Sequence, residues 1–339
     1  MSKWRLEGQP LAVSLGDPAG IGPELLAEAW LQRRAENLPA FFAVGGAEVI
    51  AAAARRRGIE VPVRRITEPS QAQGSFAEAL PVLGDADGEY RPGEPAPEGA
   101  ELALASLTEA ARLAVSGAAG GLVTGPIAKA RLAEAGFAHP GQTEFVAEAC
   151  GVAAGDAVMM LAGPSLRTVP LTVHAALSEV PSLLNSELIE RRAAITAEAM
   201  RRDFGLERPR LAIAALNPHA GEEGRMGGEE ARIIAPAIAA LRARGIDATG
   251  PHPADALFAP HERDRYDVAI CMYHDQALIP LKALDFDAGV NVTLGLPVIR
   301  TSADHGTAFA IAGKRQARPG ATIAAIRLAG DCAARRQGK

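Results

Sequence analysis

Three histidines each follow an apolar, strand-like run, and this pattern is the clearest sign of chemistry in the chain. The runs are Leu-Thr-Val before His174, a strand ending Leu-Asn-Pro before His219, and Ala-Ile-Cys-Met-Tyr before His274. Ligands of α/β proteins bind at the carboxyl ends of strands. Three imidazoles brought there could hold one divalent metal ion and leave a position open for substrate. A single such histidine is more often structural, and the long spacing matches no compact metal motif.

The residue after His274 admits two functional interpretations. Asp275 could fix the tautomer of a metal-bound imidazole, or it could form an acid/base pair with His274. A surface turn is the alternative without chemistry. The sequence alone does not decide among the three.

Residues 289–309 carry the densest set of polar side chains. Asn291 and Arg300 flank a Gly/Pro turn, and the planar fork of Arg300 suits phosphate or carboxylate. Lys282 is close enough in sequence to join it. The small, polar stretch from Asp304 to Ala308 would let a ligand approach the backbone.

Two further segments stand where helices are expected to begin. Thr143 and Glu144 open a helix-like stretch whose free N–H groups could meet an anion, although plain N-capping by Thr143 explains it equally well. The glycine-rich turn over residues 14–24 has neither the Gly-x-Gly-x-x-Gly spacing nor a P-loop. A nicotinamide enzyme with this sequence must therefore bind its dinucleotide by another device.

Strand-like and helix-like stretches alternate along the chain and must position these residues. Short apolar runs at 11–15, 41–44 and 121–124 are each followed by a helical pattern. Runs at 157–162 and 168–173, joined by Gly163-Pro164, predict a hairpin. The order predicts a mostly parallel sheet covered by helices, with a hairpin insertion.

Composition narrows the class further. The chain has 339 residues, 48% of them hydrophobic and 22% charged, with a formal net charge of -5. These values are typical of a globular protein of about two domains, and they argue against a nucleic-acid partner. No apolar run is long enough to cross a membrane. Three cysteines without paired spacing favour the reducing cytoplasm.

Taken together, these segments resemble the 4-hydroxythreonine-4-phosphate dehydrogenases of pyridoxine biosynthesis. The resemblance covers most of the chain, in the same order. The stretch from Asp304 to Lys314 also resembles the His-Gly-Ser-Ala-Pro-Asp-Ile-Ala-Gly-Lys region of isopropylmalate and isocitrate dehydrogenases. The resemblance implies two α/β/α domains with mostly parallel mixed sheets, like those enzymes: residues 1–136 with 300–339, and residues 137–299 carrying the metal and the dimer contacts.

The resemblance also implies roles for individual residues. The metal, Zn2+, Co2+ or Mg2+, would be bound by three histidines, and the active site would be shared in a homodimer in which His274 comes from the partner subunit. Lys282 and Asp275 are the candidates for the catalytic base. NAD or NADP would contact the loop Asp304, His305, Gly306, Thr307 and Ala308, and substrate would contact Gln142, Thr143, Lys282, Asn291 and Arg300.

The family usually has histidine where this chain has Gln142, and glutamine cannot carry a proton in a relay. The reaction implied is NAD(P)-dependent oxidation of 4-phosphonooxy-L-threonine, followed by decarboxylation to 3-amino-2-oxopropyl phosphate. Alternatives are a related dehydrogenase for another phosphorylated four-carbon hydroxy acid or a cyclic dihydrodiol carboxylate, a metal-dependent lyase or hydrolase without NAD, and a binding protein without activity.

Overall fold

The computed structural model describes residues 8–338, and the chain divides into two compact units. The first unit comprises residues 1–154 with 296–339, and the second comprises residues 155–295. The boundaries differ from those predicted, because residues 137–154 fall in the first unit. Phe137 is buried there in one cluster with Leu107 and Leu132, which keeps this segment with the first core.

The first unit is built on a fully parallel sheet in the order β3-β4-β2-β1-β5-β12. β2 lies on one side of β1 and β5 on the other, so the strand order reverses between β1 and β5. A crevice at the carboxyl ends of such a pair is the usual ligand site of an open parallel sheet. The strands are β1 Leu11–Ser14, β2 Phe41–Val44, β3 Val63–Ile66, β4 Leu80–Leu83, β5 Leu122–Thr124 and β12 Arg300–Ala303.

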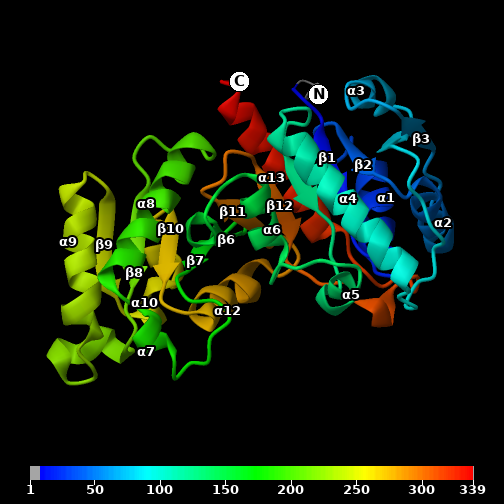
Figure 1. The fold of residues 1–339 in the computed structure, drawn as a ribbon. Helices are drawn as coiled ribbons and strands as arrows, with labels where there is room; N and C mark the ends of the chain where they lie inside the picture. The colour runs from blue at the N-terminus through cyan, green and yellow to red at the C-terminus, as the bar shows by residue number, and fades with distance from the viewer. Residues whose placement is uncertain (1–7, 339) are drawn as a thin grey trace. The chain divides into compact units, whose positions relative to one another are not determined.

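Helices cover this sheet (Figure 1). The long helix α4, cyan in Figure 1, packs against β1 and β2, whereas α13 packs against β12 and β5 and α1 packs against α2. The central strands are apolar and buried, so the helices close over a mostly aliphatic core. The helices are α1 Gly22–Leu31, α2 Ala47–Arg57, α3 Gln71–Ser75, α4 Pro97–Val115, α5 Lys129–Glu134, α6 Gln142–Ala149, η4 Phe309–Ile311 and α13 Gly320–Arg336, with η1 Ala154–Asp156 at the boundary.

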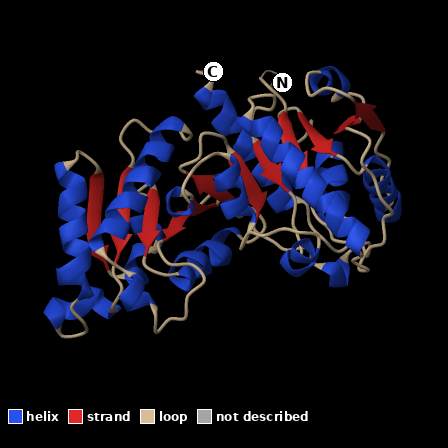
Figure 2. Cartoon of the chain, viewed as in Figure 1, coloured by secondary structure: helices blue, strands red, loops and turns tan. Residues whose placement is uncertain are grey.

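The second unit has a mixed sheet in the order β11-β6-β7-β10-β8-β9. β6 is antiparallel to β11 and to β7, and the remaining pairs are parallel. The predicted hairpin is therefore present, and it supplies the antiparallel character. The strands, red in Figure 2, are β6 Val158–Ala162, β7 Arg167–Pro170, β8 Arg210–Ala214, β9 Asp247–His252, β10 Val268–Cys271 and β11 Val290–Leu294.

One helix of the second unit, α12, is tied to that hairpin. Asp285 in its last turn accepts hydrogen bonds from the backbone N–H and the hydroxyl of Ser165, at 2.8 and 2.9 Å. This contact fixes the helix that starts at His274. The helices are α7 Val180–Leu183, α8 Ser186–Arg202, η2 Pro218–Gly224, η3 Glu230–Ile234, α9 Ala235–Ala243, α10 Ala254–Leu257, α11 Pro260–Arg263 and α12 His274–Asp285.

The predicted α/β class with mostly parallel sheets is confirmed, but four strands were missed. β9 and β12 read Asp-Ala-Thr-Gly-Pro-His and Arg-Thr-Ser-Ala, so neither forms an apolar run. β3 lies at the edge of its sheet and carries the exposed Arg64 and Arg65, so no apolar run marks it. β4 contains Pro81, a residue that normally argues against an interior strand. Among the helices within residues 8–338, none is long and apolar enough to cross a membrane.

Candidate active site

Arg300 is the centre of a polar cradle in the first unit. It opens β12 and is 3% exposed. Its Nη2 donates to Thr124 Oγ1 at 2.7 Å and to Gln142 Oε1 at 3.1 Å, and its Nη1 donates to Thr143 Oγ1 at 3.4 Å. The structure therefore brings together three of the predicted substrate-binding residues at the carboxyl end of β5.

The backbone beside this cradle is tightly packed. Gln142 Nε2 donates to the carbonyl of Gly125 at 3.0 Å, so both ends of its amide are engaged and its orientation is fixed. A Cβ at Gly125 would lie 2.6 Å from the carbonyl oxygen of Ser14. Only glycine lets β1 and β5 end this close together, at the point where the strand order reverses.

The charge of Arg300 gives the cradle its chemistry. Burial lowers the pKa of Arg300 to about 10, an effect that the nearby Glu144 partly opposes. The guanidinium is still protonated at neutral pH, and its three side-chain acceptors in the cradle are neutral oxygens that do not cancel its charge. A buried cation in such surroundings is suited to a phosphate or carboxylate ligand.

The loop from Asp304 to Ala308 follows β12 and rests on the start of α1. The carbonyl oxygen of Thr307 accepts a hydrogen bond from Ile21 N–H at 3.0 Å, and a Cβ at Gly20 would meet the same oxygen at 2.9 Å. The glycine-rich turn thus supports this loop instead of forming a dinucleotide fingerprint. His305 Nε2 is buried without a hydrogen-bond partner among the described residues, which leaves it available to a ligand.

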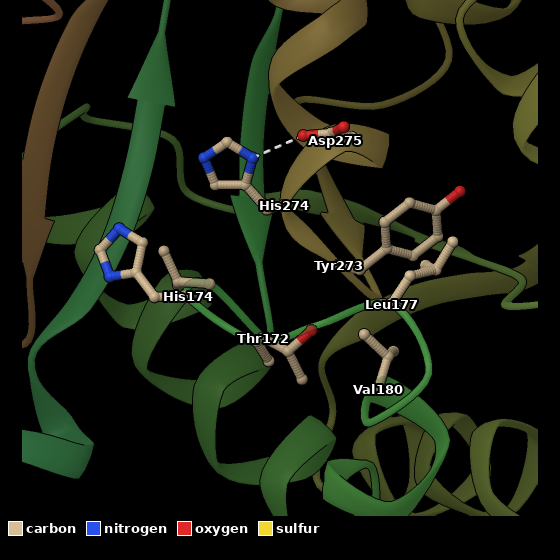
Figure 3. Close-up of a pocket in the computed structure, with 9 residues that line it drawn as sticks. Thr172, His174, Leu177, Val180, Tyr273, His274 and Asp275 are labelled. Carbon is tan, nitrogen blue, oxygen red and sulfur yellow. Dashed lines mark hydrogen bonds and ion pairs between the residues drawn. The ribbon is translucent and has the colours of Figure 1, made fainter.

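Two of the three predicted metal-binding histidines meet in the second unit (Figure 3). The ring centroids of His174 and His274 are 6.4 Å apart, and His274 Nδ1 lies 2.7 Å from Asp275 Oδ1. They line a pocket of about 360 Å³ together with Leu177 and other residues of the same two loops. The adjacency follows from the sheet, because β7 and β10 are parallel neighbours.

The Asp275 contact favours one of the interpretations left open by the sequence. A carboxylate on Nδ1 holds the imidazole in the tautomer that leaves Nε2 free to bind a metal ion. Asp275 therefore orients His274, and it is less available as an independent base.

His219 stands apart in a strained turn. It begins a left-handed stretch that runs through Glu223, with φ of 51° at His219 and 54° at Ala220. Residues other than glycine in this conformation cost about 1–2 kcal/mol each. The buried Glu230 holds the turn by accepting hydrogen bonds from Leu216 N–H and Asn217 N–H. Such strain is characteristic of functional segments.

The expected metal site is not complete within one chain. Across residues 8–338, no three histidine, cysteine or acidic side chains are grouped closely enough to hold a metal ion. His174 and His274 supply two donors, and His219 does not complete a set with them.

Two further predicted residues lie on other elements of the second unit. Asn291 is on β11, and its Oδ1 is buried without a hydrogen-bond partner among the described residues. A buried amide oxygen of this kind is suited to a ligand donor. Lys282 is half-buried on α12, two turns after His274.

The sequence prediction missed two members of this constellation. Thr124 accepts a hydrogen bond of 2.7 Å from Arg300, and Tyr273 lines the histidine pocket. Thr124 is a polar residue at the carboxyl end of an apolar strand, the same signal that singled out the histidines. Tyr273 is adjacent to His274 in sequence.

A parallel α/β fold with a buried arginine beside the carboxyl end of β5, next to the point where the strand order reverses, is typical of proteins that bind small anionic ligands. The family model described as "Pyridoxal phosphate biosynthetic protein PdxA" matches residues 37–329. The chain belongs to this PdxA family, as its sequence predicted. The expected enzyme class, a dehydrogenase of pyridoxal phosphate biosynthesis, is also confirmed.

Individual relatives support the assignment. The 4-hydroxythreonine-4-phosphate dehydrogenase of Erythrobacter litoralis is 61% identical over 97% of this chain and 98% of its own length. The crystal structure of the Klebsiella pneumoniae enzyme of that name has a TM-score of 0.85 at 38% identity, covering 96% of this chain and 98% of that one. A terephthalate 1,2-cis-dihydrodiol dehydrogenase from Burkholderia xenovorans has a TM-score of 0.65 at 30% identity, covering 96% and 98%.

Proposed function

We propose that this chain oxidises the 3-hydroxyl of 4-phosphonooxy-L-threonine with NAD+ or NADP+. Hydride passes to the nicotinamide, and the hydroxyl proton passes to a base. The resulting β-keto acid loses CO2, and protonation of the carbanion gives 3-amino-2-oxopropyl phosphate. The observation that carries the proposal is the buried Arg300 among the oxygens of Thr124, Gln142 and Thr143, an anion-binding cradle in a member of this dehydrogenase family.

Substrate binding is assigned to five residues. Arg300, Gln142 and Thr143 would hold an anionic group of the substrate in the first unit. Lys282 and Asn291 are also assigned to substrate binding, and the unsatisfied Oδ1 of Asn291 could accept a hydrogen bond from the substrate ammonium or hydroxyl. Because Gln142 cannot carry a proton, its role is to orient Arg300 and the ligand.

We assign the role of proton acceptor to Lys282. Of the two candidates, Asp275 already lies 2.7 Å from His274 Nδ1 and orients that ring. The loop from Asp304 to Ala308 is proposed to contact the NAD or NADP, and the available Nε2 of His305 supports a ligand there.

We further propose that one divalent ion, Zn2+, Co2+ or Mg2+, is bound by His174, His219 and His274 of the partner subunit. The ion would polarise the reacting oxygen when bound.

Exposed apolar side chains support a homodimer through this face of the second unit. Ile279 on α12 and Phe286, the residue that caps its carboxyl end, are 63% and 69% exposed. Leu177, at the rim of the histidine pocket, is 68% exposed. Apolar side chains gathered this way usually mark a protein–protein contact.

The double variant Ile279→Asp/Phe286→Asp tests this surface. Charges buried in a homodimer contact would oppose association, so we expect a monomer by light scattering and loss of turnover. Leu31→Asp is the matched control, because Leu31 is 44% exposed on α1 of the first unit. A double variant that remains a fully active dimer would rule out α12 as the dimer contact.

A second candidate substrate is a cyclic cis-dihydrodiol carboxylate, which the likeness to the Burkholderia xenovorans enzyme favours. The decisive assay follows reduced nicotinamide and released CO2 with both substrates, with and without Zn2+, Co2+ or Mg2+. We expect turnover with 4-phosphonooxy-L-threonine and little with the dihydrodiol. The reverse preference would replace the proposed substrate, and metal-dependent turnover without NAD(P)+ would refute the dehydrogenase. The three free cysteines fit the proposed cytoplasmic location.

A further inference from the structure

An exposed group of cations forms where α2 ends against a later segment of the first unit. We call residues 313–318 the strap. Arg56 Nε donates to the carbonyl of Gly313 at 3.3 Å, and Arg315 Nε donates to the carbonyl of Arg56 at 3.1 Å. These two contacts attach the side chain of each arginine to the backbone of the other segment, so both cations lie where α2 meets the strap. Lys314, between Gly313 and Arg315, is also exposed.

The position of Arg315 is built into the backbone. Arg315 has a φ of 60°, a conformation that residues other than glycine rarely adopt. Its guanidinium lies over Gly58, where an added Cβ would be only 3.2 Å from Arg315 Cζ. A glycine therefore provides the space that the guanidinium occupies, and backbone strain directs the side chain there.

Arg56, Lys314 and Arg315 carry no compensating carboxylate in the described part of the chain. The ion pairs among residues 8–338 include Arg57 with Glu24 and Glu28, but none of these three cations. The protein as a whole has a formal net charge of -5. A concentration of uncompensated cations on an acidic protein favours an anionic ligand.

We infer that Arg56, Lys314 and Arg315 bind the 2′-phosphate of NADP+ and make the enzyme prefer NADP+ over NAD+. The inference rests on the proposed function, because it names the cofactor of that reaction. The strap is separated from the proposed cofactor loop, 304–308, only by η4 Phe309–Ile311 and Ala312. Dinucleotide enzymes commonly accommodate this phosphate with a nearby arginine.

A purely structural explanation makes a different prediction. Arg315 also places a positive charge at the carboxyl end of α2, which stabilises a helix. In that case its removal would lower thermal stability and affect both cofactors alike. Only a contact with the 2′-phosphate would change the ratio of kcat/KM for NADP+ to kcat/KM for NAD+.

The experiment measures kcat/KM for NADP+ and NAD+ with the wild type, Arg315→Ala, Arg56→Ala and Lys314→Ala. Lys314→Ala tests the phosphate site with little risk to folding, because the Lys314 side chain is exposed. Losing a hydrogen bond to a charged group should lower the NADP+/NAD+ ratio of kcat/KM by roughly tenfold for either arginine. Arg55→Ala, on the same turn of α2 and without a hydrogen bond to the strap, should leave the ratio unchanged.

Binding provides a readout independent of turnover. Calorimetry compares ADP-ribose, its 2′-phosphorylated form and inorganic phosphate on the same proteins. We expect the 2′-phosphate to tighten binding to the wild type by roughly tenfold or more and to give little gain in Arg315→Ala. No gain in the wild type, equal losses for both probes, or inorganic phosphate binding as tightly as the 2′-phosphorylated probe would each overturn the inference. If the wild type catalysed no turnover but still bound 2′-phosphorylated ADP-ribose more tightly than ADP-ribose, that result would instead count against the proposed reaction.

Discussion

Arg300→Ala is expected to lower kcat/KM for 4-phosphonooxy-L-threonine by a factor that lies between about thirty and a few thousand. Removing one partner of a buried charged contact typically costs roughly 2–5 kcal/mol, and each 1.4 kcal/mol is a factor of ten. Arg300 is 3% exposed and contacts three of the cradle's oxygens, so no neighbouring cation can take its place without rearrangement. Steady-state kinetics measure the effect.

Two further variants distinguish a loss of substrate recognition from a loss of protein stability. Arg33 is also buried in the first unit, but its guanidinium donates to backbone carbonyls of Trp30 and Phe76. Arg33→Ala should lower the melting temperature and leave kcat/KM nearly unchanged. Arg300→Lys should recover only part of the activity, because the planar fork is lost.

The unphosphorylated substrate identifies the group that Arg300 binds. If Arg300 holds the phosphate, this substrate is poor with the wild type and loses little more in Arg300→Ala. Equal losses for both substrates would show that Arg300 binds the carboxylate or supports the loop. The phosphate would then have to be sought at Thr143 and Lys282.

Sequence periodicity predicted the sheets well because their central strands are short apolar runs. β2 was predicted at its observed limits. Four strands were missed: β3 carries exposed arginines at a sheet edge, β4 contains a proline, and β9 and β12 are polar. None of them forms an apolar run, and β12 is defined by its pairing with β5, far away in sequence.

The candidate site was predictable only one element at a time. Strand ends pointed to His174 and His274, and the parallel pairing of β7 and β10 explains why they meet. The role of Thr124 depends on β5 and β12 being neighbours, a relation between segments far apart in sequence. The left-handed turn at His219 could not be predicted, because most residues in it are not glycine and it is held by the distant Glu230.

Mixing inactive His174→Ala and His274→Ala chains is expected to restore about a quarter of the wild-type activity. In a symmetric dimer with His274 supplied by the partner, random exchange makes about half of the dimers mixed, and one of the two sites in each is then intact. Metal content should recover in parallel, which provides a readout apart from turnover.

The proximity of His174 and His274 within one chain makes this experiment discriminating. Their ring centroids are 6.4 Å apart, so a site using both from the same chain would gain nothing from mixing. His174→Ala mixed with His219→Ala is the matched control, since both residues are proposed to come from one subunit and no activity should return. If mass spectrometry shows subunit exchange and His174→Ala with His274→Ala stays inactive, the shared site is wrong, and His219 must reach the other two histidines by unwinding its left-handed turn.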